Sequence, residues 1–101
     1  MTIYAIVQVK IHDPVRYKLY EDNFWSVFSQ FNGQILVNDY APRVLEGEWN
    51  NDKVVLISFP DQDSFTAWAT SPDYMEIVKD RHAAGDATIL LSNEFDINAN
   101  I

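Results

Sequence analysis

The sequence contains no cysteine in its 101 residues, and it has only 3 glycines and 4 prolines. Without cysteine the chain cannot form disulfides, a thiolate nucleophile or a zinc-ribbon spacing. So few glycines and prolines favour compact elements that are joined by short turns. With a hydrophobic content of 48%, these features predict one globular domain over residues 1–101.

Long apolar runs are also missing. The longest uninterrupted runs are about the length of a strand, which is too short to span a bilayer. The first ten residues have neither the basic region nor the long apolar region of a secretory signal. We therefore expect a cytoplasmic protein that has no membrane partner.

Basic residues are scarce as well: 15 acidic and 7 basic residues give a net charge of −8. Such a surface repels phosphate backbones and argues against nucleic acid as a partner. Motifs of nucleotide, dinucleotide, serine-hydrolase and zincin sites are absent. His12 and His82 fall in different elements without a recognised metal spacing, so we expect no metal and no other cofactor.

The first third of the chain has clear periodicity. Positions 3–11 alternate, which predicts a strand with one fully apolar face. Asp13 and Pro14 then provide the N-cap and the first-turn proline of a helix, and Asn32-Gly33 provides a left-handed stop. The apolar stripe of this helix recurs at steps of three and four, and consists of Tyr17, Tyr20, Phe24, Val27, Phe28 and Phe31.

The middle of the chain predicts two or three strands. These are segments 34–38, 44–49 and 54–59, separated by a turn that contains Pro42 and a second turn at 50–52.

Two helical segments and a strand complete the pattern. One helix opens at Pro60 and Asp61, Ser71-Pro72 interrupts it, and a second helix continues from Pro72 to about Ala84. Gly85 ends this helix. Positions 87–92 predict a short strand, and a polar tail runs from about residue 92 to residue 101.

This order of elements predicts an α+β ferredoxin-like βαββαβ sandwich, with helices on one face of an antiparallel sheet. The strand at 54–59 is nevertheless apolar on both faces, since Val54 and Leu56 oppose Val55, Ile57 and Phe59. A monomer rarely leaves such a face in water. We expect the second face of the sheet to be covered by another subunit, a ligand or both.

One charge interrupts an apolar stripe. A helix from Pro72 places Arg81 on the same face as Tyr74 and Val78. A guanidinium cannot lose its proton and is costly to bury unpaired, so it needs a carboxylate, a carbonyl or an anionic ligand. Glu46 is a plausible partner, because a bidentate pair would satisfy both groups. A pair that only orients the helix and an anionic ligand both remain open.

Few other side chains could supply chemistry. Glu46 and Glu48 would lie on one side of a strand, roughly 7 Å apart, which suits acid and base work but is also typical of a solvated edge. His82 could act as a base near neutral pH or could cap the end of its helix. The candidate catalytic residues are therefore His82 and Glu46.

Aromatic residues could line a pocket for a planar organic anion, although aromatic stripes are more often core. The candidate ligand-binding residues are Arg81, Trp49, Trp68, Tyr74, Tyr17 and Tyr20.

Two segments carry a family resemblance: Leu45-Glu46-Gly47-Glu48-Trp49 and Ser71-Pro72-Asp73-Tyr74. Over nearly the whole chain, the sequence resembles the family catalogued as domain of unknown function 1330. The resemblance also includes Asp13-Pro14, residues 31–37 and 54–60, and Arg81. The resemblance implies a dimeric α/β barrel, in which two ferredoxin-like subunits form a homodimer through the sheet face. The wider group includes cofactor-independent monooxygenases and muconolactone isomerases. This chain has Asn38-Asp39-Tyr40 where the family pattern has a more glycine-rich turn. The side chain of Tyr40 could therefore alter access to a pocket.

Three functions are open on these grounds: a cofactor-independent enzyme, monooxygenase-like or isomerase-like; a non-catalytic ligand-binding or regulatory module; and a structural dimer. The leading expectation is a protein that binds a small organic anion, with or without transforming it. An enzyme predicts a pocket in which Arg81 and His82 or Glu46 converge on empty space. A structural dimer predicts that protein carboxylates occupy Arg81.

Overall fold

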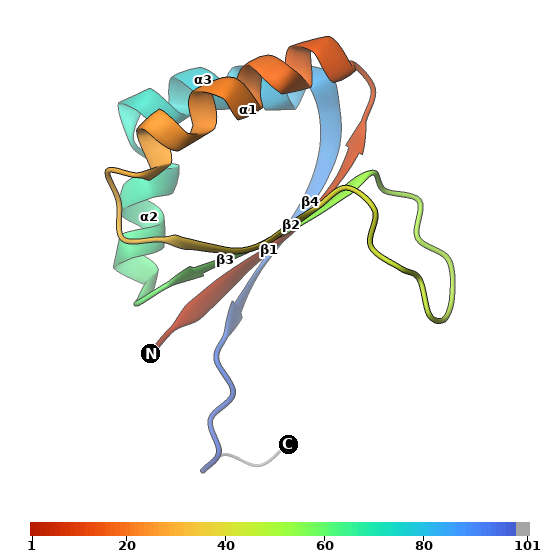
Figure 1. Cartoon of the computed structure of the whole chain (residues 1–101). Helices are drawn as coiled ribbons and strands as arrows, with labels where there is room; N and C mark the ends of the chain where they lie inside the picture. The colour runs from red at the N-terminus through yellow and green to blue at the C-terminus, as the bar shows by residue number, and fades with distance from the viewer. Residues whose placement is uncertain (99–101) are drawn as a thin grey trace.

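A four-stranded antiparallel sheet carries three helices on one face in the computed structural model, which describes residues 1–98 (Figure 1). The strands lie in the order β2-β3-β1-β4, which confirms the predicted ferredoxin-like βαββαβ fold. Within residues 1–98, no helix is long and apolar enough to cross a membrane. The elements are β1 Ile3–Ile11, α1 Pro14–Phe28, β2 Gln34–Asp39, β3 Lys53–Phe59, α2 Gln62–Ala69, α3 Pro72–Ala84 and β4 Gly85–Asn93.

Each helix begins close to the position that the sequence indicates, directly after a capping residue. A side-chain oxygen of the cap accepts a hydrogen bond from an N–H group in the first turn, which has no partner within the helix. The caps and their donors are Asp13 with Arg16 (3.1 Å), Asp61 with Ser64 (2.7 Å) and Ser71 with Tyr74 (3.2 Å).

The end of α1 differs from the prediction. The helix ends at Phe28, and neither Asn32 nor Gly33 has a positive φ, so the left-handed stop expected there is wrong. Glycine is needed at position 33 for another reason. A Cβ there would lie 2.5 Å from Cζ of Phe28 and 2.7 Å from Cε1 of Phe59. Gly33 therefore lets the backbone pass directly against the aromatic core.

The strand predicted over 44–49 is wrong. These residues belong to the connection between β2 and β3, which projects beyond the end of the sheet (Figure 1), and only two strands form over 34–59. β2 contains an irregularity between Ile35 and Val37 and pairs with β3 only as far as Asp39 opposite Val54. Residues 44–49 pair with no strand of the sheet, and alternation alone does not hold a strand.

The last strand is longer than predicted. β4 begins at Gly85, directly after α3, and extends to Asn93, so the tail starts later than residue 92. The predicted tail reaches Ile101, which lies outside the described residues together with positions 99 and 100.

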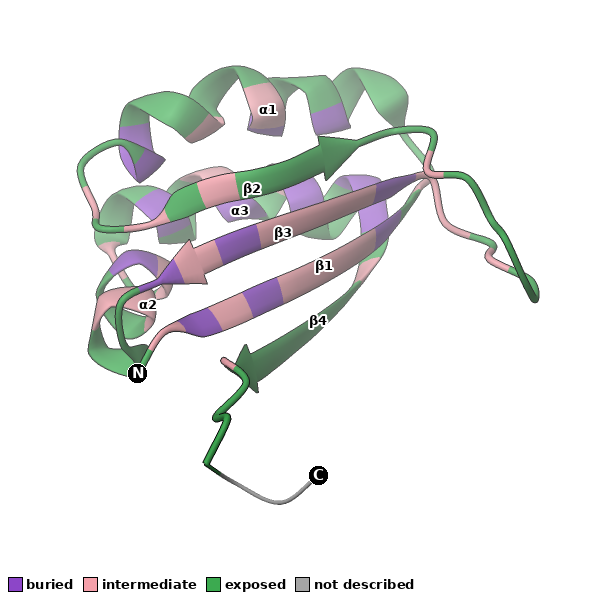
Figure 2. Cartoon of the chain, turned by 60° about the horizontal axis from the view of Figure 1, so that its bottom comes forward, coloured by how far each residue is buried: buried purple, intermediate pink, exposed green. Residues whose placement is uncertain are grey.

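The two faces of the sheet have different surroundings. The helices cover one face and enclose a core in which Val9, Phe28 and Phe59 are almost completely buried. No helix covers the opposite face, which Figure 2 shows from below. Alternation along β1 and β3 places Ile6 and Leu56 on that open face, paired across the two strands and half-buried.

Candidate functional site

A cavity of about 600 Å³ lies between the helix layer and the sheet, and all seven elements contribute to its walls. This volume is within the range of small-molecule sites, and the walls are mainly apolar. The aromatic side chains that line it are Tyr17, Tyr20, Phe24, Trp25, Phe65, Trp68 and Tyr74.

Six of the predicted site residues line this cavity. They are Arg81, His82, Tyr17, Tyr20, Trp68 and Tyr74.

Two predicted site residues, Glu46 and Trp49, lie elsewhere. Glu46 is exposed in the connection between β2 and β3, while Nε1 of Trp49 donates to Oε1 of Gln8, 2.9 Å away, on the open face of β1. The expected pair of Glu46 with Arg81 does not form, because the strand expected to carry Glu46 and Glu48 does not exist. Neither glutamate can act in this cavity from that position.

Arg81 reaches the cavity from the last turn of α3. It is only 8% exposed, and its guanidinium carbon lies 5.9 Å from the centre of the Tyr20 ring. Within residues 1–98, its side chain has neither a hydrogen bond nor an ion pair. A buried cation without a counter-charge costs free energy, and an anion entering the cavity would offset that cost.

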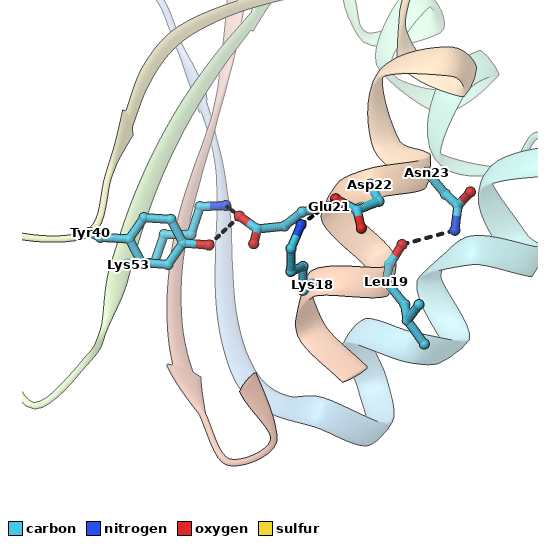
Figure 3. A network of polar contacts seen from close by, with 7 residues as sticks. All are labelled: Lys18, Leu19, Glu21, Asp22, Asn23, Tyr40 and Lys53. Atoms are coloured by element: carbon cyan, nitrogen blue, oxygen red, sulfur yellow. Dashed lines mark hydrogen bonds and ion pairs between the residues drawn. The ribbon is translucent and has the colours of Figure 1, made fainter. Parts of the chain in front are cut away.

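Lys53 is a second buried cation in the cavity wall, and it is neutralised. Its Nζ lies 2.8 Å from Oε2 of Glu21, which also accepts a hydrogen bond from the hydroxyl of Tyr40 (Figure 3). The rings of Tyr17 and Tyr40 flank the ammonium, with centroids 5.2 Å and 4.9 Å from Nζ. Only 6% of the Lys53 side chain is exposed.

Sequence reasoning did not single out Lys53 or Glu21. One signal was available, because Lys53 shares the alternation of Val55, Ile57 and Phe59 and so points toward the helices. Its partner could not be inferred, since Glu21 lies 32 residues earlier in the chain.

Tyr17 and Tyr20 line the cavity as neutral groups. Burial is the main reason that the pKa of Tyr17 is raised to about 12 and that the pKa of Tyr20 lies well above its ordinary value. Neither phenol therefore supplies a negative charge to Arg81 near neutral pH. The hydroxyls of Tyr20 and Tyr74 form a buried hydrogen bond of 2.8 Å.

His82 is exposed and lies at the rim of the same cavity, next to Arg81 in α3. Trp68 also lines the cavity, and its Nε1 is buried and has no acceptor among residues 1–98. No group of three or more histidine, aspartate or glutamate side chains in that range could hold a metal ion. The cavity thus offers one unpaired cation, one imidazole and aromatic walls.

The sequence profile of the family described as "Domain of unknown function (DUF1330)" matches residues 2–95. The chain belongs to the DUF1330 family. This finding confirms the resemblance in the two segments around Gly47 and Asp73. No curated protein matches the sequence.

Solved structures share the fold of this DUF1330 chain. A protein of unknown function from Rhodopseudomonas palustris, RPA0582, has a TM-score of 0.77 at 21% identity, covering 94% of this chain and 83% of its own. SnoaB, a cofactor-independent oxygenase from Streptomyces nogalater, has a TM-score of 0.70 at 12% identity, covering 98% of each chain. A dimeric ferredoxin-like protein of unknown function from Bacteroides fragilis has a TM-score of 0.64 at 16% identity, covering 93% and 96%.

Proposed function

We propose that this DUF1330 protein binds a small organic anion with a planar, apolar body in the cavity between its helices and its sheet. The observation that carries this proposal is the position of Arg81, which is buried in the cavity wall without a protein counter-charge. A guanidinium holds a carboxylate through two parallel hydrogen bonds. The aromatic side chains around it suit a flat hydrophobic body.

A purely structural role for Arg81 is less well supported. Such a role would require a carboxylate or carbonyl partner within the fold, as Glu21 provides for Lys53. The arginine on α1, Arg16, shows the ordinary arrangement, with its Nε 3.0 Å from Asp80 at the surface. The contrast with these two cations favours a ligand as the partner of Arg81.

Thermal unfolding with benzoate and with benzamide, which has the same shape without the charge, tests the proposal. A ligand that binds only the folded protein raises its stability in proportion to the logarithm of ligand concentration over Kd. We expect stabilisation by benzoate, much less by benzamide, and none by either compound in Arg81→Met. Arg16→Met is the matched control and should respond as the wild type does. Equal responses of Arg81→Met and wild type would refute the assignment.

A catalytic role is the second candidate, and the location of His82 favours it. Its imidazole lies on the rim of the cavity beside Arg81, where it could take a proton from a bound phenol or carbon acid. The shared fold with a cofactor-independent oxygenase makes phenolic acids reasonable first substrates. If the role is catalytic, His82→Gln should keep benzoate binding but lose oxygen uptake with such acids. No oxygen uptake by the wild type across a phenolic series would leave the binding function alone.

We also propose that two copies of the chain pair through the open face of the sheet. Support comes from its apolar side chains, including Leu36 and Leu90, which are 48% and 52% exposed. Monomers rarely expose such a surface to water. The ferredoxin-like relative from Bacteroides fragilis is dimeric, which agrees with this arrangement.

A further inference from the structure

Apart from His82, the acidic and basic side chains that line the cavity are Glu21, Lys53 and Arg81. Glu21 and Lys53 form an ion pair with 2.8 Å between Oε2 and Nζ, whereas the side chain of Arg81 has no partner within residues 1–98. Tyr17 and Tyr20 add no negative charge near neutral pH, because burial raises the pKa of each. The wall therefore holds two cations and one anion, which leaves a single uncompensated positive charge.

The two cations lie against neighbouring aromatic rings. The ammonium of Lys53 is 5.2 Å from the centre of the Tyr17 ring, and the guanidinium carbon of Arg81 is 5.9 Å from the centre of the Tyr20 ring. The two ring centres are 5.7 Å apart. A flat molecule that is held at Arg81 and extends along these tyrosines therefore points toward Lys53.

Lys53 is closed to a second anion, however. Glu21 pairs with its ammonium on one side, next to Tyr40 (Figure 3). The rings of Tyr17 and Tyr40 lie over the same ammonium. Tyr40 also donates its hydroxyl hydrogen to the same oxygen of Glu21, so the carboxylate is held by two donors. A ligand carboxylate could reach Lys53 only by displacing Glu21, and that would leave Glu21 in the cavity wall without its cation.

We propose that Glu21 determines the charge selectivity of this cavity: it occupies Lys53, so that the site accepts planar acids with one negative charge and rejects those with two. This inference rests on the proposed function and specifies its ligand class. Glu21 acts as a selectivity residue through Lys53 and does not contact the bound acid. Compounds such as aromatic monocarboxylates fit the site, whereas aromatic dicarboxylates and phosphate monoesters do not.

The experiment compares the Kd of benzoate with those of isophthalate and terephthalate, measured by NMR titration of the labelled protein. All titrations use one pH, about 8, so that pH does not enter the comparison. In the wild type we expect benzoate to bind at least about tenfold more tightly than either diacid. In Glu21→Gln this preference should disappear, with at least one diacid gaining about tenfold as Lys53 becomes available.

Asp22→Asn is the matched control, since Asp22 is the next residue of α1 and pairs with Lys18 at the surface (Figure 3). It removes the same charge from the protein but should leave the ratio of the Kd values unchanged. A change of net charge alone would affect both variants equally. An equal ratio in Glu21→Gln and Asp22→Asn would therefore overturn the inference.

The dispersion of the NMR spectrum shows whether Glu21→Gln folds. If it does not, two further variants test the role of Glu21. Lys53→Gln leaves Glu21 unpaired and should weaken benzoate binding by about tenfold through repulsion. Adding Glu21→Gln to it should restore benzoate binding without any gain for the diacids. Failure of the double variant to restore it would contradict the inference. A wild type that binds none of these acids would refute the proposed function itself, which is a distinct outcome.

Discussion

The two faces of the sheet carry similar apolar side chains but differ in what covers them and in how exposed their charged residues are. On the covered face, Ile57 and Phe59 are buried under helices, and the space that remains contains Lys53 and Arg81. On the open face, Ile6 and Leu56 are only half-buried. A lysine on that face, Lys10, has its side chain 51% exposed and lies 3.6 Å from Asp52. Cationic side chains are thus buried on the covered face and exposed to water on the open face. Buried charge suits a ligand site, whereas an apolar face with exposed charge suits a contact with another subunit.

The covered face should dominate the stability of the chain. Phe28 is 1% exposed, and its ring contacts those of Phe24, Phe59 and Trp68. We expect Phe28→Ala to lower the free energy of unfolding by about 3–5 kcal/mol, because it removes buried area and leaves a void. Leu90→Ala on the open face should cost less than about 1 kcal/mol. Urea unfolding at low protein concentration measures both, and equal losses would contradict the comparison.

The open face should govern assembly. Leu56→Lys places a charge at the centre of that face and should weaken a homodimer by about a hundredfold or more, since an unpaired charge would be buried on association. Leu19→Lys, at an exposed position of α1, is the control and should leave the assembly unchanged. Sedimentation at micromolar concentration should give twice the chain mass for wild type and control, and one chain mass for Leu56→Lys. A monomeric wild type would contradict the proposed interface.

The two buried cations should respond differently to removal. Lys53→Met leaves the carboxylate of Glu21 without its ion pair, and we expect a loss of about 1–3 kcal/mol, since Glu21 is partly exposed. Arg81→Met removes a cation that has no protein partner, so without ligand it should cost less than about 1 kcal/mol or stabilise the fold. Urea unfolding without added acids tests this contrast. A loss for Arg81→Met as large as that for Lys53→Met would indicate a protein partner for Arg81.

The smallest expected effect is on the free energy of unfolding at alkaline pH. Burial raises the pKa of Tyr17 from 10.0 to about 12 in the folded protein. Between these values the unfolded chain loses its proton while the folded protein keeps it, so the free energy of unfolding falls as pH rises from about 10 to about 12. Tyr17→Phe should flatten part of this decline. Urea unfolding across that range, with tyrosinate absorbance as a second readout, provides the test, and identical slopes would contradict it.

Sequence reasoning was most successful where local chemistry decides the outcome. Asp13 and Ser71 mark the starts of their helices because capping involves residues only three positions apart. Arg81 was recognisable as a charge on an apolar stripe. The alternation over 44–49 misled because a strand also needs a neighbour to pair with, and sequence periodicity does not show whether one exists.

The charge balance of the cavity was beyond local patterns. Glu21 and Lys53 are separated by 32 positions, and no nearby residue in the sequence indicates that they form an ion pair. Their meeting depends on how α1 lies across β3, which follows from packing of the whole core. The same dependence explains why Tyr40, which is remote from α1 in sequence, bonds to Glu21.

The pairing of β1 with β4 has a consequence for how the protein folds. Its register joins Ile3 to Asn93 and Ile11 to Gly85, so β1, the first strand of the sheet in sequence, pairs with one of its two neighbours only after β4, the last strand, has been made. Contacts between distant parts of a chain form slowly, because the entropy of closing a large loop is lost before the contacts contribute any stabilising free energy. Until β4 has been made, the growing chain therefore exposes one edge of β1.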